Sequence, residues 1–181
     1  MRRVAGLHGR ALLLVSLASV AVTGQVSSAD PFQHVAFLIG RWQGTTEGQP
    51  GKGTVQREYV RVMNSRFIRV RNQSTYPVQP QNPKGEVHED EGFISFDRTR
   101  KTLVLRQFHV EGFVNQYAED AGSPPERVSF TSEQIENIPP GWRARETYVM
   151  KGPDAFEEIF ELAEPGKPFE VYSHARFTRI R

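Results

Sequence analysis

Four residues with chemically useful side chains occur as two pairs, and the members of each pair are two positions apart. His88 precedes Asp90, and Tyr172 precedes His174. Side chains two positions apart on a β-strand project from the same face, so each pair would present two donor groups to one site. Histidine is the commonest metal ligand in proteins. His88 and Asp90 could therefore be read as half of a metal site, but the sequence shows no third ligand, so we do not favour this interpretation.

Several catalytic arrangements are absent from the sequence. The chain contains no cysteine, which excludes disulfides, thiolate metal sites and a thiol nucleophile. It also lacks the Gly-x-Ser-x-Gly motif that would indicate a serine hydrolase. His109 remains as a further imidazole that could face a ligand.

The first 29 residues have the three parts of a secretory signal peptide. They begin with a basic segment, continue with a run of small and aliphatic residues at 11–22, and end with small residues at 27–29 that suit cleavage before Asp30. The apolar run at residues 11–22 is shorter than the roughly 20 residues that cross a bilayer. We therefore expect the signal peptide to be removed and the mature protein to have no membrane anchor. The mature protein, residues 30–181, is expected to be a single domain that is secreted or periplasmic.

Removal of the signal changes the net charge. The whole chain has 23 basic and 21 acidic residues, a net charge of +2. The signal holds Arg2, Arg3 and Arg10 and no acidic residue, so the mature chain carries a net charge of −1. A chain this close to neutrality gives no support to a nucleic-acid or anionic-membrane partner.

The elements that must position the candidate residues are mostly strands. One short helix is expected first, with Asp30 as N-cap, Pro31 at the first helical position and Gly40 at its end. After Gly40 the dominant period of apolar residues is two, interrupted by turn residues, which is typical of antiparallel strands. The expected strands cover residues 41–47, 54–63, 66–76, 86–96, 101–111, 113–119, 127–138, 142–151, 155–163 and 169–180.

About ten strands joined mostly by short turns predict an all-β fold, an antiparallel up-and-down barrel whose closure removes the exposed sheet edges. A two-sheet sandwich is the alternative. A barrel of this width is too wide for side chains to fill, so it is expected to leave a cavity for a small ligand.

Five arginines lie on two adjacent expected strands between residues 57 and 71. We expect them on the solvent-facing side of the barrel, alternating with valine and isoleucine. The alternative is that one of them points inward and binds a carboxylate through a bidentate pair. The five are Arg57, Arg61, Arg66, Arg69 and Arg71.

Residues 37–48 carry the first resemblance to a known family. A short helix that ends in Gly-x-Trp-x-Gly, built around Trp42, is similar to the opening of calycin barrels, and in particular to that of the nitrobindin family of haem-binding barrels. The resemblance implies that Trp42 packs across the closed end of the barrel. It also implies that a basic residue of the last strand lies over this ring, here Arg179 or alternatively Arg181.

Later segments resemble the same family. Residues 88–93 look like its H-x-E-x-G-[FYW] strand, with Asp90 at the acidic position, and residues 103–114 look like the strand pair that follows and bends at a glycine. The last strand of nitrobindins carries the histidine that binds haem iron, and the matching position here is Tyr172. Tyrosinate can ligate ferric haem, and His174, one rung away, is the alternative ligand.

The resemblance implies an exported barrel that binds haem b or a similar flat, apolar molecule. Tyr172 or His174 would then bind the iron, and His88 and His109 would face the ligand. The family's chemistry, isomerisation of peroxynitrite to nitrate and binding of nitric oxide, would follow if haem is bound. The alternative is a non-catalytic carrier or sensor of a lipid or other apolar metabolite in the same cavity, which the tyrosine at the axial position favours.

Overall fold

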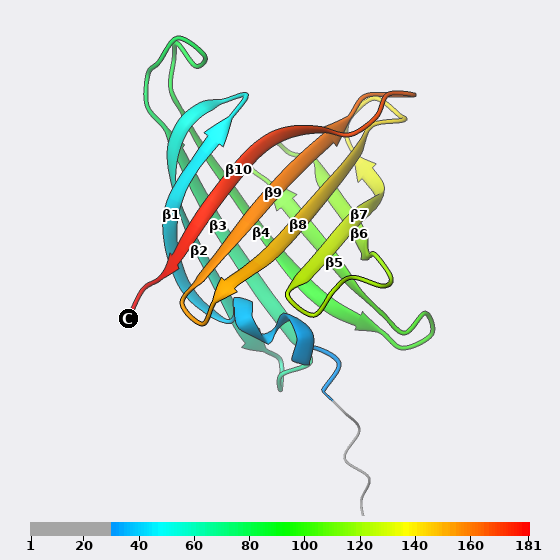
Figure 1. The fold of residues 1–181 in the computed structure, drawn as a ribbon. Coiled ribbons are helices and arrows are strands. Elements are labelled where there is room, and N and C mark those ends of the chain that lie inside the picture. The colour runs from blue at the N-terminus through cyan, green and yellow to red at the C-terminus, as the bar shows by residue number, and fades with distance from the viewer. Residues whose placement is uncertain (1–29) are drawn as a thin grey trace, which may run out of the picture.

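Ten antiparallel strands form a closed barrel in the computed structural model, which describes residues 30–181 (Figure 1). The expected signal peptide, residues 1–29, lies outside the described residues. The strands are β1 (Gly40–Gly48), β2 (Gly51–Val62), β3 (Phe67–Tyr76), β4 (Glu86–Asp97), β5 (Thr102–His109), β6 (Val114–Glu119), β7 (Arg127–Glu136), β8 (Arg143–Gly152), β9 (Ala155–Ala163) and β10 (Glu170–Arg179).

Each strand pairs with its neighbours in the sequence, and the pairing of β1 with β10 closes the barrel. Closure leaves no strand with an unpaired row of backbone N–H and C=O groups. The prediction of a ten-stranded up-and-down barrel is therefore confirmed, and the alternative of a two-sheet sandwich is wrong.

One end of the barrel is closed by a short helix, but this helix differs from the predicted one. It is the 3₁₀ helix η1 (Gln33–Leu38), and it does not begin at Asp30. The Asp30 carboxylate instead accepts the Phe32 N–H at 3.0 Å and pairs with Arg61. A 3₁₀ run of six residues is longer than the three or four that are usual. No helix within residues 30–181 is long and apolar enough to cross a membrane.

Trp42 is the centre of the packing at the closed end. Its indole N–H donates to the Leu38 carbonyl at 2.7 Å, and its ring meets Phe156 edge-on at 4.8 Å between centroids. The Arg179 guanidinium lies over the ring, 4.1 Å from its centroid, and donates at 2.6 Å to the Ile39 carbonyl. The expected contact between the last strand and Trp42 is present and is made by Arg179, whereas Arg181 pairs with Asp154 and is exposed.

Candidate functional site

A cavity of about 580 Å³ occupies the opposite, open half of the barrel. Residues of the β1–β2, β5–β6 and β7–β8 connections line it, so these loops surround its mouth. Its volume lies within the range of about 300–1,000 Å³ that is usual for small-molecule sites. Most of the lining is apolar and comes largely from β7 to β9 and the β7–β8 connection, including Ile135, Ile138, Trp142, Phe160 and Leu162.

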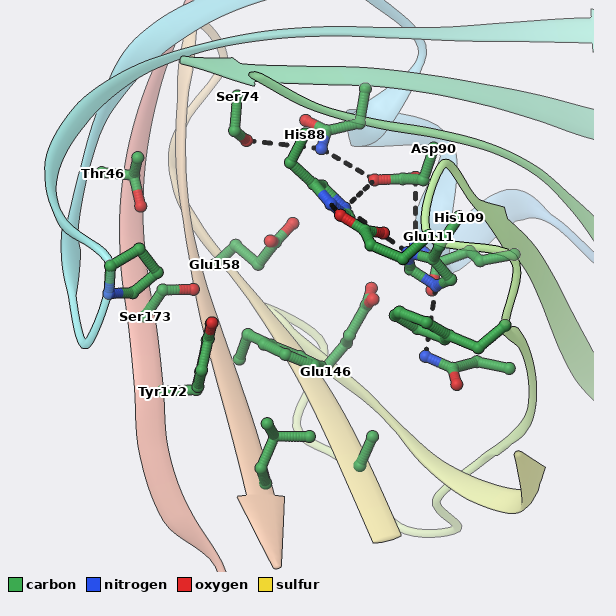
Figure 2. Close-up of a pocket in the computed structure, with 18 of the residues that line it drawn as sticks. Thr46, Ser74, His88, Asp90, His109, Glu111, Glu146, Glu158, Tyr172 and Ser173 are labelled. Atoms are coloured by element: carbon green, nitrogen blue, oxygen red, sulfur yellow. Dashed lines mark hydrogen bonds and ion pairs between the residues drawn. The ribbon is translucent and has the colours of Figure 1, made fainter. Parts of the chain in front are cut away.

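The opposite wall carries a polar group that we call the histidine cluster, consisting of His88, Asp90, His109 and Glu111. Figure 2 shows the four side chains gathered on one side of the cavity. His88 Nδ1 lies 2.8 Å from Glu111 Oε1, and His88 Nε2 lies 3.5 Å from Asp90 Oδ2. The two imidazoles meet where His109 Nδ1 lies 3.4 Å from His88 Nε2. Both expected histidines thus face the cavity and contact each other.

The two imidazoles of the histidine cluster differ in protonation. Burial alone would lower the pKa of His88, but the hydrogen bonds and charges of Asp90 and Glu111 outweigh it and raise that pKa to about 9. Burial is the main cause that lowers the pKa of His109 to about 4, and the neighbouring His88 charge adds to it. At neutral pH the cluster therefore combines an imidazolium with a neutral imidazole.

Buried amide side chains hold the cluster in place. Asn72 Nδ2 donates to Asp90 at 2.8 Å, Gln107 Nε2 lies 3.5 Å from the same carboxylate, and Asn115 Nδ2 lies 3.2 Å from His109 Nε2. Gln107 Oε1 and Asn115 Oδ1 are buried and have no hydrogen-bond partner within residues 30–181. Buried polar atoms are normally paired, so these two oxygens in the cavity lining indicate room for a donor from water or a ligand.

Arg57 lies inside the barrel, so the expectation that the whole arginine group faces solvent is wrong at this position. It forms an ion pair with Glu158, and its Nε donates to Asn72 at 3.2 Å. The two charged side chains are only 6% and 9% exposed, and a buried charge is tolerated when it is paired in this way. The other four arginines lie partly or fully at the surface, at Arg61, Arg66, Arg69 and Arg71.

A second carboxyl group, that of Glu146, shares the cavity lining with Glu158 (Figure 2). The Tyr148 hydroxyl donates to it. Burial is the main cause that raises the pKa of Glu146, and it outweighs the opposing charge of Arg57. The inner part of the cavity is thus rich in carboxyl groups, and within residues 30–181 the one guanidinium of the lining, that of Arg57, is already paired.

The last strand places Tyr172 and His174 on different faces, although strand periodicity predicts a shared face. Tyr172 projects into the cavity (Figure 2), where its ring meets Phe160 edge-on at 5.7 Å. His174 lies outside the cavity lining, with its imidazole 3.5 Å from Glu157 and 3.4 Å from Arg176. The reason is an irregularity in the β9–β10 pairing between Val171 and Ser173, which interrupts the alternation at Tyr172.

The environment of Tyr172 favours its neutral form. Burial is the main cause that raises its pKa, and the nearby Glu86, Tyr76 and Glu111 raise it further. A phenolate at this position would therefore need a bound cation beside it.

Sequence reasoning missed Glu111 as a neighbour of His88, although a signal for it exists. The β4–β5 hairpin turns at the pair Asp97–Thr102, and counting outward from there pairs Asp90 with His109. Extending the same register by two positions on each side places His88 opposite Glu111. Strand pairing therefore joins two histidines that appear unrelated in the sequence.

Comparison with known proteins supports the fold. No family model matches the chain, and no curated protein matches it. The structure is similar to that of Rv2717c from M. tuberculosis, with a TM-score of 0.65 and 16% identity over 83% of this chain and 98% of that chain. A redesigned β-barrel, b11L5F_LGL, matches with a TM-score of 0.44 and 11% identity over 82% of this chain and 96% of that one. EF1p2_mFAP2b bound to DFHBI matches with a TM-score of 0.42 and 13% identity over 81% of this chain and 97% of that one. At these identities the similarity concerns the barrel fold alone.

Proposed function

We propose that this protein is an exported barrel that binds a small, mostly apolar molecule in its open half. The observation that carries the proposal is the cavity of about 580 Å³, apolar over most of its lining and polar along one wall. Small-molecule sites typically combine an apolar lining with a few polar groups that orient the ligand. The signal predicted at residues 1–29 supports a secreted or periplasmic location.

The charges around the cavity narrow the ligand's chemistry. Glu86, Asp90 and Glu111 line it, and Arg57 is already paired with Glu158. Among the described residues of the lining, a ligand carboxylate would meet acidic groups, a His88 imidazolium already paired with Asp90 and Glu111, and no unpaired guanidinium, which is unfavourable at short range. We therefore expect the part of the ligand that enters the inner cavity to be neutral or cationic, and any ligand carboxylate to lie at the mouth.

Ferric haem is the specific candidate, because the donor groups of the cavity can accommodate it. Tyr172 projects into the cavity from the wall that faces His88 and His109 (Figure 2). Tyr172 would hold the iron, whose positive charge would stabilise the phenolate in these acidic surroundings. Bound haem would supply the peroxynitrite and nitric oxide chemistry of nitrobindins. Phe160 would keep the Tyr172 ring oriented, and the apolar wall would exclude water.

Titration of the purified protein with haemin, followed in the Soret region, tests this assignment. The parent is expected to give a ferric high-spin complex with phenolate charge-transfer absorption, and dithionite is expected to loosen the haem because tyrosinate holds ferrous iron poorly. Tyr172→Phe keeps the ring packing and should abolish binding. His174→Ala, outside the cavity, should bind like the parent. Unchanged haemin binding by Tyr172→Phe would contradict the assignment.

A non-catalytic carrier of an apolar metabolite is the second candidate. The raised pKa of Tyr172 favours it, because a neutral phenol is a hydrogen-bond donor rather than an iron ligand. A parent protein that shows no Soret band with haemin but binds a neutral apolar dye would make the carrier the better proposal.

A further inference from the structure

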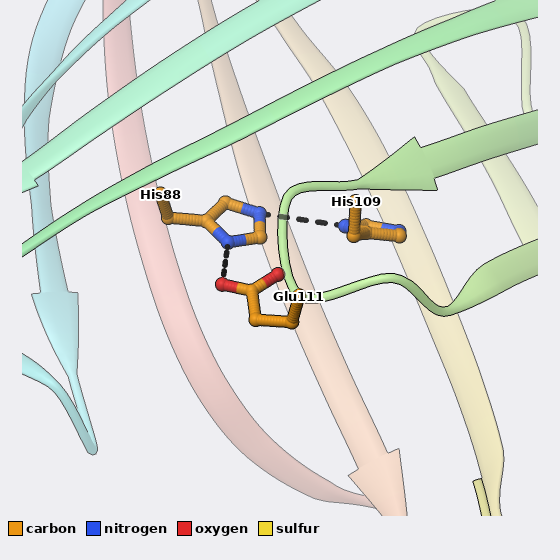
Figure 3. A group of neighbouring side chains, drawn as sticks. All are labelled: His88, His109 and Glu111. Atoms are coloured by element: carbon orange, nitrogen blue, oxygen red, sulfur yellow. Dashed lines mark hydrogen bonds and ion pairs between the residues drawn. The ribbon is translucent and has the colours of Figure 1, made fainter. Parts of the chain in front are cut away.

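We propose that the histidine cluster is a binding site for a divalent transition-metal ion, zinc being the simplest example, independent of any haem. One ligand atom each from His88, His109 and Glu111 lies within 4.8 Å of the others (Figure 3). The three residues come from β4, from the last residue of β5 and from the β5–β6 connection. The hairpin pairing therefore brings together a set of ligands that zinc commonly uses.

The spacing of the two imidazoles already suits such an ion. In tetrahedral zinc sites with ligand bonds of about 2.0–2.1 Å, neighbouring ligand atoms lie about 3.3 Å apart. His109 Nδ1 and His88 Nε2 are 3.4 Å apart. Glu111 now contacts the other nitrogen of His88 at 2.8 Å, and its side chain is 42% exposed. Binding would release the proton of the His88 imidazolium to solvent, and the accessible Glu111 side chain would turn from His88 Nδ1 toward the ion.

Neighbouring residues already orient the proposed ligands. Phe113 stacks on the His109 ring at 4.1 Å with an interplanar angle of 19°, and Asn115 contacts its Nε2. Such outer partners set the orientation of ligating imidazoles and raise metal affinity. Asp90, fixed by Asn72, lies 3.5 Å from His88 Nε2, the nitrogen that faces His109, so its carboxylate is beside the proposed ion rather than behind the imidazole.

The chemistry of the site selects the class of ion. Two imidazoles with a carboxylate suit zinc and the neighbouring first-row divalent ions, whereas calcium and magnesium prefer sites built of oxygen ligands. The carboxylates of Asp90 and Glu111 would balance the charge of the ion. All three ligands line the cavity, so the remaining coordination position would face a water or a bound molecule, as in sites where zinc acts as a Lewis acid.

Isothermal titration of zinc into untagged, chelator-treated protein tests the site. We expect one ion per chain, and we expect the double variant His88→Ala, His109→Ala to bind at least about 100-fold more weakly, the upper end of what loss of a supporting residue costs. His34→Ala is the matched control, because His34 is half-exposed on η1 and pairs with Glu119. It should bind zinc like the parent.

A measurement on the unmodified chain covers the case in which the double variant fails to fold. In spectra of the imidazole nitrogens, zinc should shift the signals of His88 and His109 and leave those of His34 and His174 in place. The proposal would be overturned by a lack of one-to-one binding, by unchanged affinity in a folded double variant, or by shifts confined to His34 or His174.

Discussion

Replacing Arg57 with alanine is expected to lower the free energy of unfolding by about 3–5 kcal/mol. The substitution leaves Glu158, which is only 9% exposed, without its partner in a cavity lining that also holds the carboxyl of Glu146. It also removes the donor that contacts Asn72, the residue that fixes Asp90 of the histidine cluster. Urea unfolding followed by far-ultraviolet circular dichroism would measure the loss.

Arg71→Ala is the matched control for this experiment. Arg71 lies on the neighbouring strand and pairs with Glu91 at 3.2 Å, but both side chains are about half exposed. Its replacement should cost less than about 1 kcal/mol. The double variant Arg57→Met, Glu158→Leu should recover most of the stability, because apolar replacement of a whole buried pair is often neutral. A loss below about 1 kcal/mol for Arg57→Ala would contradict the buried pair.

Trp42→Ala is also expected to lower the free energy of unfolding by about 3–5 kcal/mol, the range for large aromatic residues in protein cores. The ring is 1% exposed and fills the closed end against Phe156. Its removal leaves a cavity and takes away the surface on which the Arg179 guanidinium lies. Because typical domains are stable by only about 5–15 kcal/mol, the midpoint of urea unfolding should fall sharply.

Two other substitutions serve as comparisons for Trp42→Ala. Trp42→Phe keeps an aromatic ring and should cost clearly less than alanine, with the loss of the bond to Leu38 accounting for part of the difference. Phe108→Ala, on the outer face of β5 and 52% exposed, should change stability by less than about 1 kcal/mol. Equal losses for Trp42→Ala and Phe108→Ala would show that Trp42 does not organise the closed end.

The fold could be predicted from the sequence because its signals are local. Alternation and turn residues predict ten strands, and the strand at residues 155–163 agrees at both ends with β9. The helix was less predictable: the Asp30 carboxylate does accept the Phe32 N–H, but the capping pattern reveals neither that the helix is of the 3₁₀ type nor that it begins only at Gln33. Arg57 was missed for a related reason: its partner Glu158 lies 101 positions away, and a lone arginine in a strand is ordinarily expected at the surface.

The candidate site was only partly predictable. His88, His109 and Tyr172 all line the cavity, as expected from the resemblance. His174 does not line the cavity, because the irregularity beside Tyr172 shifts the alternation of side chains by one residue. Side-chain periodicity predicts neither the presence nor the position of such an irregularity. Glu111 was missed because its contact with His88 depends on the register of a hairpin rather than on spacing within one strand.

The most direct test of the proposed function is the affinity of a neutral, polarity-sensitive dye such as Nile red for two matched variants. Leu162 on β9 lines the cavity, and Val171 on the adjacent β10 is 56% exposed. Fluorescence titration should show one dye per chain for the parent and for Val171→Trp. The affinity of Leu162→Trp should be at least about tenfold lower, because the indole occupies the space of the ligand. Equal affinity in parent and Leu162→Trp would contradict binding inside the barrel.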